Sequence, residues 1–444
     1  MQESMSFQFN ILVVEDEKDW IDILLDALKR EFESSSQYTW DSVRTTPAAS
    51  EQLSKRRYHF VSIDQNIPDK VGEVVNPLNG LTLCQRIVER KLLTQRIIYT
   101  AYGEKHYSNW VGKLEGTPYY EKSVTGDDDP QKGVYSAHGW ASLIRSTIEK
   151  EFIPFALDQA GYYLPLSLSE RARRAHSAYD TGAYESYIRL WIEIWESVLH
   201  LAFAQTLALC SNASVRMDNL PDGTLGNKEQ ILQKAWPRLH EANWMGPWLR
   251  YIGVGNRKTG AGVGRRFLQG ASEPMRRLRN DISHSFTTDS WEEKSIECEE
   301  SFLHLTDAIA FWIENPLLTN LQFHSTSRNR LAGNAIVGDQ LPFPNWEGDA
   351  YGLDFLSGAE ADCACLIWRR EGEKPQVLIL DPFIVLEREE RTGRQHLLLL
   401  SHPARERELW LYRSLTDGRI KPRKLSSSQL QAITSVFGRY HARR

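Results

Sequence analysis

The spacing of hydrophobic and polar positions changes twice along the chain, near residues 153 and 326, and divides it into three segments. In the first, short runs of β-forming residues such as "FNILVV" and "RIIYT" alternate with amphipathic stretches such as "WIDILLDALKREF". In the second, apolar residues recur at helical spacing, and in the third, short β-rich runs are separated by turn signals. The pattern predicts a multidomain protein with a flavodoxin-like α/β domain (1–152), an all-α bundle (153–325) and a small antiparallel β-rich module with a closing helix (326–444).

Alternating strands and helices in the first segment predict a parallel sheet with helices on both faces. The carboxyl ends of such strands meet at one edge, and the residues expected there are Glu15, Asp16, Asp64, Thr100 and Lys122. Three carboxylates at one point repel one another unless a hard divalent cation lies among them, and oxygen ligands suit Mg²⁺. Asp64 could then attack a phosphoryl group whose charge the metal and Lys122 neutralise, while Thr100 hydrogen-bonds the transferred group.

Four short motifs in this segment resemble the receiver domain of two-component response regulators. They are "ILVVEDE", the "DQNIP" turn with a proline four residues after the aspartate, "YTA", and the lysine of "YYEKS". The resemblance covers roughly residues 8–152. It implies that Asp64 is a phosphoacceptor served by a histidine kinase, and that Tyr119 is the aromatic switch residue. It also implies that Glu15, Asp16, Asp64 and the backbone carbonyl of Asn66 bind Mg²⁺.

The sequence departs from the receiver pattern in two places. The loop after Pro68 is long, and Ser123 replaces the proline that usually follows the lysine, with an acidic insertion "GDDDP" after it. Two alternatives therefore stay open. One is a flavodoxin-like domain with acids at a loop edge, and the other is a receiver that folds but is never phosphorylated.

The most apolar helix predicted in the second segment carries one narrow polar stripe. Its five members, Glu185, Arg189, Glu193, Glu196 and His200, are spaced by three or four residues and fall within about 80° of the helix circumference. The stripe is either a ladder of ion pairs from Glu185 to Arg189 and from Arg189 to Glu193, or the wall of an active site.

A later helix contains "LRNDISH". Its apolar face consists of three residues spaced by four, Leu278, Ile282 and Phe286. Asn280 and His284 lie on roughly the opposite side, and Arg279 lies between the two faces. The polar trio therefore points away from its own bundle core, as in a solvated helix or in a site completed by a second subunit.

A basic stretch precedes this motif. Between Arg250 and Arg279 there are eight basic residues, one acid and six glycines, which predict a mobile, positively charged loop beside the histidine. Six of the basic residues are our candidates for binding RNA phosphates: Arg257, Lys258, Arg265, Arg266, Arg276 and Arg277.

"RNDISH" is similar to the arginine, four residues, histidine signature of HEPN domains. The resemblance implies metal-independent RNA cleavage by attack of the 2′-OH on the adjacent phosphorus. His284 would then act as general acid or base, Arg279 would stabilise the charge of the phosphorane, and Asn280 would orient the histidine or the phosphate. It also implies a site built across a homodimer, with Glu193 or Glu196 supporting the arginine.

Composition adds few constraints. The net charge of −5 does not indicate a general nucleic-acid binder, and five scattered cysteines predict neither disulfides nor a structural zinc site. The acids within the most apolar run argue against a membrane span, so we expect a cytoplasmic protein. We identify no catalytic constellation in the third segment and expect a recognition or regulatory module there.

These observations lead to one hypothesis and one rival. The first is a phosphorylation-responsive effector of the response-regulator class whose HEPN-like output cleaves RNA in stress or phage defence. The rival is a non-catalytic adaptor that relays phosphorylation through protein–protein contacts. DNA-binding regulation is disfavoured, because no convincing helix-turn-helix is present.

Overall fold

The fold is described from a computed structural model of the 444-residue chain. The structure describes residues 6–33, 35–73, 76, 78–101, 111–123, 125–253, 262–283, 290–324, 327–337, 345–349, 363–368, 373–388, 395–404 and 409–438. The chain forms two compact units, Ser6–Ala156 and Leu157–Arg444, and the division between them falls within helix α4 (Ala137–Tyr163). Within the described residues, no helix is both long enough and apolar enough to span a membrane.

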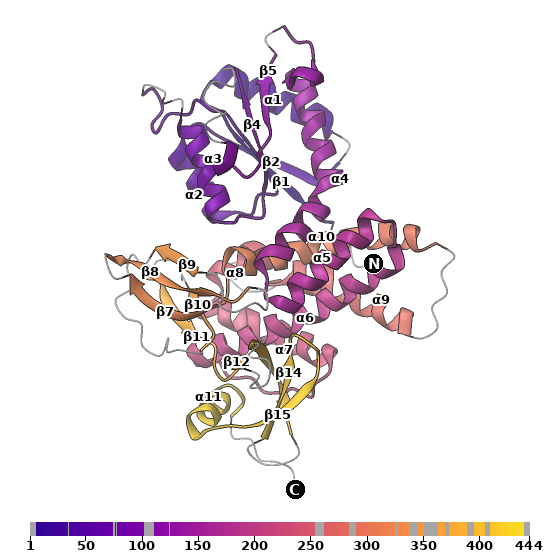
Figure 1. Ribbon diagram of the computed structural model, residues 1–444, viewed down its shortest axis with the longest axis vertical. Coiled ribbons are helices and arrows are strands. Elements are labelled where there is room, and N and C mark those ends of the chain that lie inside the picture. The colour runs from indigo at the N-terminus through magenta and orange to yellow at the C-terminus, as the bar shows by residue number, and fades with distance from the viewer. Residues whose placement is uncertain are drawn as a thin grey trace. The chain divides into compact units, whose positions relative to one another are not determined.

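The first unit is a six-stranded parallel sheet covered by helices on both faces (Figure 1), as the sequence predicts. The strand order is β2-β1-β3-β4-β5-β6. The strands are β1 (Phe9–Val14), β2 (Tyr38–Val43), β3 (Phe60–Ile63), β4 (Gln95–Thr100), β5 (Tyr119–Lys122) and β6 (Val134–Tyr135). The other helices are α1 (Lys18–Glu31), α2 (Thr46–Lys55) and α3 (Asn79–Glu89).

Burial explains this arrangement. Strands β1 and β3 are buried at every position, as expected for central strands of a parallel sheet that is covered on both faces. Helix α1 buries one apolar stripe, and its last residue, Glu31, accepts hydrogen bonds from Ser142 and Arg145 of α4, so α1 and α4 are neighbours.

Strand β6, which the sequence did not predict, follows the acidic insertion.

The second unit is built around helix α6 (Tyr184–Asn212), whose residues from Ile188 to Cys210 are mostly buried. Around it lie α5 (Leu166–Asp180), α7 (Leu225–Glu241), α8 (Gly246–Ile252), a π-helix (Arg266–Ser272), α9 (Glu273–Ser283) and α10 (Trp291–Glu314). Aromatic rings fill the core; Trp191 of α6 stacks on Phe302 of α10 with ring centroids 4.8 Å apart.

The glycine-rich basic stretch was expected to be a mobile loop, and that prediction is wrong for the part that the structure describes. Residues 266–272 form the π-helix, which continues directly into α9. Gly264 has a φ of +75°, and a Cβ at this position would lie 1.9 Å from Cε3 of Trp236. This glycine therefore permits close packing against a buried tryptophan, in a backbone conformation that side chains rarely adopt.

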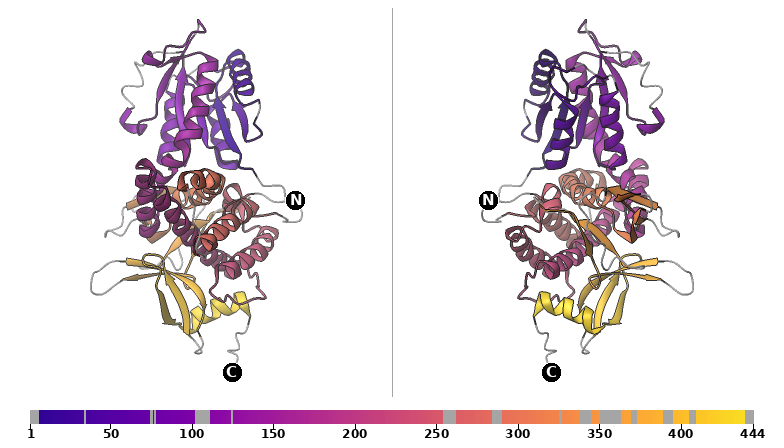
Figure 2. Two further views of the ribbon diagram at one scale, coloured as in Figure 1. Left: turned by 90° about the vertical axis from the view of Figure 1, so that its right-hand side faces the viewer. Right: turned by 90° about the vertical axis from the view of Figure 1, so that its left-hand side faces the viewer.

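The β-rich part of the second unit contains two sheets, coloured orange and yellow in Figure 2. The first has the order β11-β10-β7-β8-β9 and the second is the meander β12-β13-β14-β15. Their strands are β7 (Leu318–His324), β8 (Ser327–Ala335), β9 (Asn345–Asp349), β10 (Cys365–Trp368), β11 (Gln376–Ile379), β12 (Ile384–Arg388), β13 (Gln395–Pro403), β14 (Leu409–Ser414) and β15 (Ile420–Lys424).

The polar composition of residues 327–335 does not indicate a strand, yet this segment forms β8 because it pairs with β7 on one side and β9 on the other. The β-rich segment also packs on the helices within one compact unit: Trp368 Nε1 donates to the carbonyl of Trp244, and the amide of Met217 donates to the carbonyl of Val436. The predicted closing helix is α11 (Ser427–Phe437), and it begins with a capping box at Ser426.

Candidate functional site

Three residues meet at the carboxyl edge of the parallel sheet. Glu15 and Asp64 directly follow β1 and β3, and Lys122 ends β5. Lys122 Nζ lies 2.5 Å from Glu15 Oε2 and 2.6 Å from Asp64 Oδ2, and all three side chains are buried. The chain therefore forms a closed carboxylate–lysine–carboxylate triad at the position expected from the sequence.

The backbone around Asp64 is fixed from two sides. Its amide donates to the carbonyl of Val14 in β1, and its Oδ1 accepts from the amide of Asn66. On the other side α3 approaches so closely that a Cβ on Gly80 would lie 2.0 Å from the carbonyl oxygen of Asp64. Gly80 is thus required for α3 to pack beside the loop that carries Asp64.

The single positive charge of Lys122 does not balance the negative charges of the two carboxylates that it contacts. Burial, and then repulsion from Asp64, raise the pKa of Glu15 to about 8, although Lys122 opposes this rise. Burial and Asp64 likewise raise the pKa of Asp16. Burial alone would lower the pKa of Lys122, but contact with Asp64 and Glu15 more than offsets that effect and raises it.

The donor set fits a hard divalent cation. One carboxylate oxygen from each of Glu15, Asp16 and Asp64 can be chosen so that all three atoms lie within 4.8 Å of one another. Two residues after Asp64, the buried Oδ1 of Asn66 accepts no hydrogen bond from the described residues. Mg²⁺ prefers oxygen ligands, so it fits a partly buried cluster of carboxylates whose negative charge is not balanced by a nearby cation.

Thr100 and Tyr119 occupy adjacent strands beside the triad. Thr100 ends β4 and is fully buried, and Tyr119 begins β5 and packs partly buried against the core cluster of the unit. Lys122 Nζ also lies over two aromatic rings, 5.2 Å from the centroid of Trp20 and 5.8 Å from that of Tyr99.

Ser123 and the acidic insertion that follows it are linked in the structure. The amide of Ser123 donates to the carbonyl of Tyr135, and through this bond β5 continues to pair with β6. Proline has no amide hydrogen and could not make this bond. Serine after the lysine is therefore compatible with the extra strand that follows the acidic insertion.

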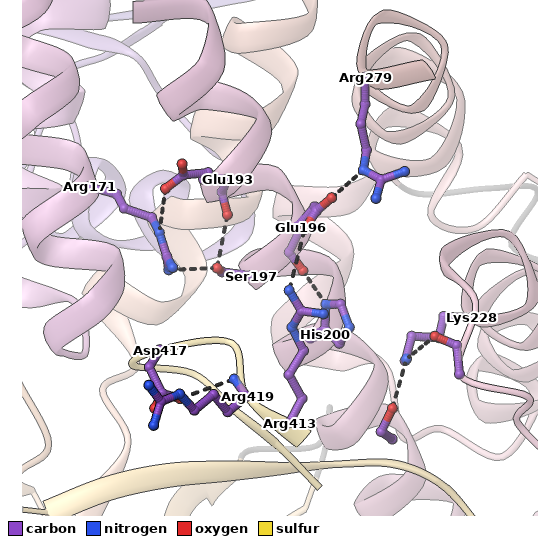
Figure 3. A network of polar contacts seen from close by, with 12 residues as sticks. Arg171, Glu193, Glu196, Ser197, His200, Lys228, Arg279, Arg413, Asp417 and Arg419 are labelled. Carbon is purple, nitrogen blue, oxygen red and sulfur yellow. Dashed lines mark hydrogen bonds and ion pairs between the residues drawn. The ribbon is translucent and has the colours of Figure 1, made fainter. Parts of the chain in front are cut away.

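The second candidate site lies on the outer face of α6, where its polar stripe divides among several partners (Figure 3). Arg279 Nε of α9 donates to Glu196 Oε1 at 2.5 Å, so Glu196 is the acid placed against the arginine. Glu193 instead pairs with Arg171 of α5 at 3.0 Å. Glu185 pairs with Arg189, which is the first step of the expected ladder.

Only part of the predicted RNA-binding set lies within the described residues. His284, Arg257 and Lys258 fall outside them. Three of the described members bond to side chains near them in the fold. Arg276 pairs with Glu229, Arg277 with Glu273, and Arg265 with the side chain of Gln269, while Asn280 is exposed next to Arg279.

Two nitrogen-bearing side chains are buried on α6 and α7: His200, a member of the polar stripe, and Lys228, which the sequence analysis did not single out. His200 Nδ1 donates to the carbonyl of Glu196, and burial near Lys228 and Arg413 lowers its pKa well below the usual range. Lys228 is fully buried, and its Nζ donates to Gly223 O at 3.2 Å and Ser401 Oγ at 3.3 Å. No local pattern could reveal that Lys228 is buried, because Ser401 and the strand β13 that carries it are distant in the sequence.

No protein-family model matches the sequence, and no curated protein is significantly similar to it. Among solved structures, the chain is similar to a signal receiver domain of an HD domain-containing protein from Pseudomonas fluorescens Pf-5, with 20% identity over 32% of this chain and 95% of that one and a TM-score of 0.24. It is also similar to a CheY-like response regulator receiver domain protein from Methanospirillum hungatei JF-1, with 19% identity, 32% and 93% coverage, and a TM-score of 0.24. A third is the receiver domain of a putative Luxo repressor protein from Vibrio parahaemolyticus, with 19% identity, 34% and 95% coverage, and a TM-score of 0.25.

Proposed function

We propose that the chain is a phosphorylation-responsive signalling effector of the response-regulator type. Asp64 accepts a phosphoryl group from a histidine kinase, and Mg²⁺ is held by Glu15, Asp16, Asp64 and the backbone carbonyl of Asn66. The observation that carries this proposal is the buried triad in which Lys122 contacts both Glu15 and Asp64. A structural salt bridge would need one acid, whereas a phosphoryl-transfer site needs a nucleophilic carboxylate, a metal-binding acid and a cation.

The chemistry follows from these positions. A carboxylate oxygen of Asp64 attacks phosphorus, the P–N bond to the donor histidine breaks, and the imidazole leaves with the electron pair of that bond. Lys122 balances part of the charge on the transferred oxygens, a Mg²⁺ ion held by the three acids would supply further positive charge, and Thr100 donates a hydrogen bond to one of these oxygens. Rearrangement of Thr100 and Tyr119 then carries the signal away from the site.

For the output, we propose RNA cleavage at Arg279, Asn280 and His284. The 2′-OH attacks the adjacent phosphorus, the bond to the 5′-oxygen breaks, and a 2′,3′-cyclic phosphate forms, with His284 transferring protons and Arg279 stabilising the phosphorane. Support comes from the hydrogen bond that Arg279 Nε donates to Glu196 Oε1, which fixes the guanidinium while its terminal nitrogens point away from Glu196 in Figure 3. A homodimer would bring two such sites together.

The test is cleavage of total RNA by the purified chain, before and after treatment with a small phosphodonor. We expect products with 2′,3′-cyclic phosphate ends, no cleavage by His284→Ala, and a response to the phosphodonor that Asp64→Asn removes. Intact RNA with a wild-type protein that still takes up phosphate would refute the nuclease and keep the signalling proposal.

A second candidate, a non-catalytic adaptor, has one observation in its favour. Arg276 and Arg277, which were expected to bind RNA, are paired with Glu229 and Glu273. Paired arginines are less available to phosphates. A phosphorylation-dependent change in binding to a partner protein, with no RNA cleavage, would favour this candidate.

A further inference from the structure

The carboxylate of Glu196 is shared between two arginines that come from different parts of the second unit. Arg279 of α9 contacts Oε1, and Arg413 of β14 contacts Oε2 through Nη2 at 3.5 Å. The bond to Arg413 is long and therefore weak, whereas the bond to Arg279 is short. Arg413 is thus held beside the Arg279 site by the fold more than by this contact (Figure 3).

The surroundings of these arginines carry more positive than negative charge. Glu196 is the acid between the two arginines, and the buried Lys228 lies close enough to Arg413 to be repelled by it. Asp222 attracts Lys228, and His200 is held neutral, so among the described residues three cations face two carboxylates. The nearby ion pairs Arg171–Glu193 and Arg419–Asp417 are neutral. An anion at this position would balance the excess charge.

We propose that Arg413 belongs to the RNA site and binds a phosphodiester next to the one that Arg279 contacts. This inference rests on the proposed RNA activity and extends it to the C-terminal meander, where the sequence predicts a recognition or regulatory module. Arg279 uses Nε for Glu196, and Arg413 uses one terminal nitrogen, so each guanidinium retains further donors for phosphate oxygens. The β14 strand therefore supplies part of the binding surface, and the helical bundle alone is incomplete.

The experiment measures binding of a fluorescently labelled single-stranded RNA of mixed sequence to the full chain carrying His284→Ala, which prevents cleavage. Arg413→Ala is compared with Arg419→Ala, an 82% exposed arginine at the neighbouring turn that serves as matched control. We expect Arg413→Ala to weaken binding about tenfold and to reduce the slope of log K against log salt by about 0.7, the loss of one phosphate contact. Arg419→Ala should change neither quantity.

Two further variants separate phosphate binding from a structural role. Arg413→Gln keeps a hydrogen-bond donor toward Glu196 and guards against unfolding of the alanine variant, and it should weaken RNA binding as Arg413→Ala does. Glu196→Gln removes the competing negative charge and should tighten binding a few-fold. If Glu196→Gln weakens binding as much as Arg413→Ala, the two residues act only as a structural ion pair and the inference is wrong.

The outcomes also separate this inference from the proposed function. RNA binding that responds equally to Arg413→Ala and Arg419→Ala refutes the role of Arg413 and leaves the proposed RNA activity standing. Failure of the His284→Ala parent to bind RNA refutes both.

Discussion

Lys228 offers a quantitative test of how the helices and the C-terminal meander pack. It is fully buried, and burial followed by repulsion from Arg413 lowers its pKa from 10.5 to about 8. At about 1.4 kcal/mol per pKa unit, burying the charged amine costs the folded state roughly 3 kcal/mol. Its hydrogen bonds to Gly223 and Ser401 return about 1 kcal/mol or less each, because both are long.

The sign of the pH dependence follows from this lowered pKa. Below pH 8 the amine is charged in both states, and the folded state bears the full cost. Between pH 8 and 10.5 the folded state releases the proton while the unfolded state keeps it, so the free energy of unfolding rises with pH. Above pH 10.5 the amine is neutral in both states and the cost disappears.

The perturbation is Lys228→Met, which fills a similar volume without charge. At pH 7 we expect the variant to be more stable than the wild type by about 1 to 2 kcal/mol. Between pH 8 and 10.5 the wild type should gain roughly 3 kcal/mol relative to the variant. Urea unfolding followed by tryptophan fluorescence measures both differences, with Lys234→Met, an exposed lysine of the same helix, as matched control. A variant that is less stable at pH 7, with curves parallel to the wild type up to pH 10.5, would show that the buried amine bears no such cost.

Three further predictions concern the first unit. Gly80→Ala places a methyl group against the carbonyl of Asp64 and should destabilise the protein by about 3 kcal/mol, which thermal unfolding measures. The same variant should incorporate less phosphate from a small phosphodonor. Ser123→Pro removes the hydrogen bond to Tyr135 and should cost about 1 to 3 kcal/mol, measured by urea unfolding, whereas Ser123→Ala should be nearly neutral. Added Mg²⁺ should raise the melting temperature of the wild type and leave that of Glu15→Gln unchanged, and equal shifts in both proteins would place the metal elsewhere.

The carboxylate–lysine–carboxylate triad could be predicted because its geometry follows from the order of the strands along the chain. In a parallel sheet the residue after each strand lies at the same edge, so Glu15, Asp64 and Lys122 could be brought together on paper once three strands were recognised. Strand β6 escaped prediction because two residues carry no periodicity, and it exists only by pairing with β5. Strand β8 has a polar composition that does not indicate a strand, and it forms because it pairs with neighbours on both sides.

The π-helix shows how composition can mislead. Six glycines in a basic stretch indicate mobility when they are considered alone. In the structure Gly264 lies against Trp236, and a Cβ on Gly270 would lie 2.4 Å from the ring of His304. Such glycines are needed where a buried ring meets the backbone, and the sequence does not show which rings those will be.

The polar stripe of α6 is a second case in which a sequence pattern did not reveal the contacts of its residues. Its regular spacing suggested one role, a ladder or an active-site wall, yet its members have different partners. Glu185 pairs within the helix, Glu193 with α5, and Glu196 with both α9 and β14. On an otherwise buried helix, acids that are partly removed from water are stabilised where neighbouring elements bring cations to them. The position of Glu196 between Arg279 and Arg413 therefore ties the motif on α9 to the C-terminal meander, and a change in how that meander packs on α6 would alter the charge around Arg279 directly.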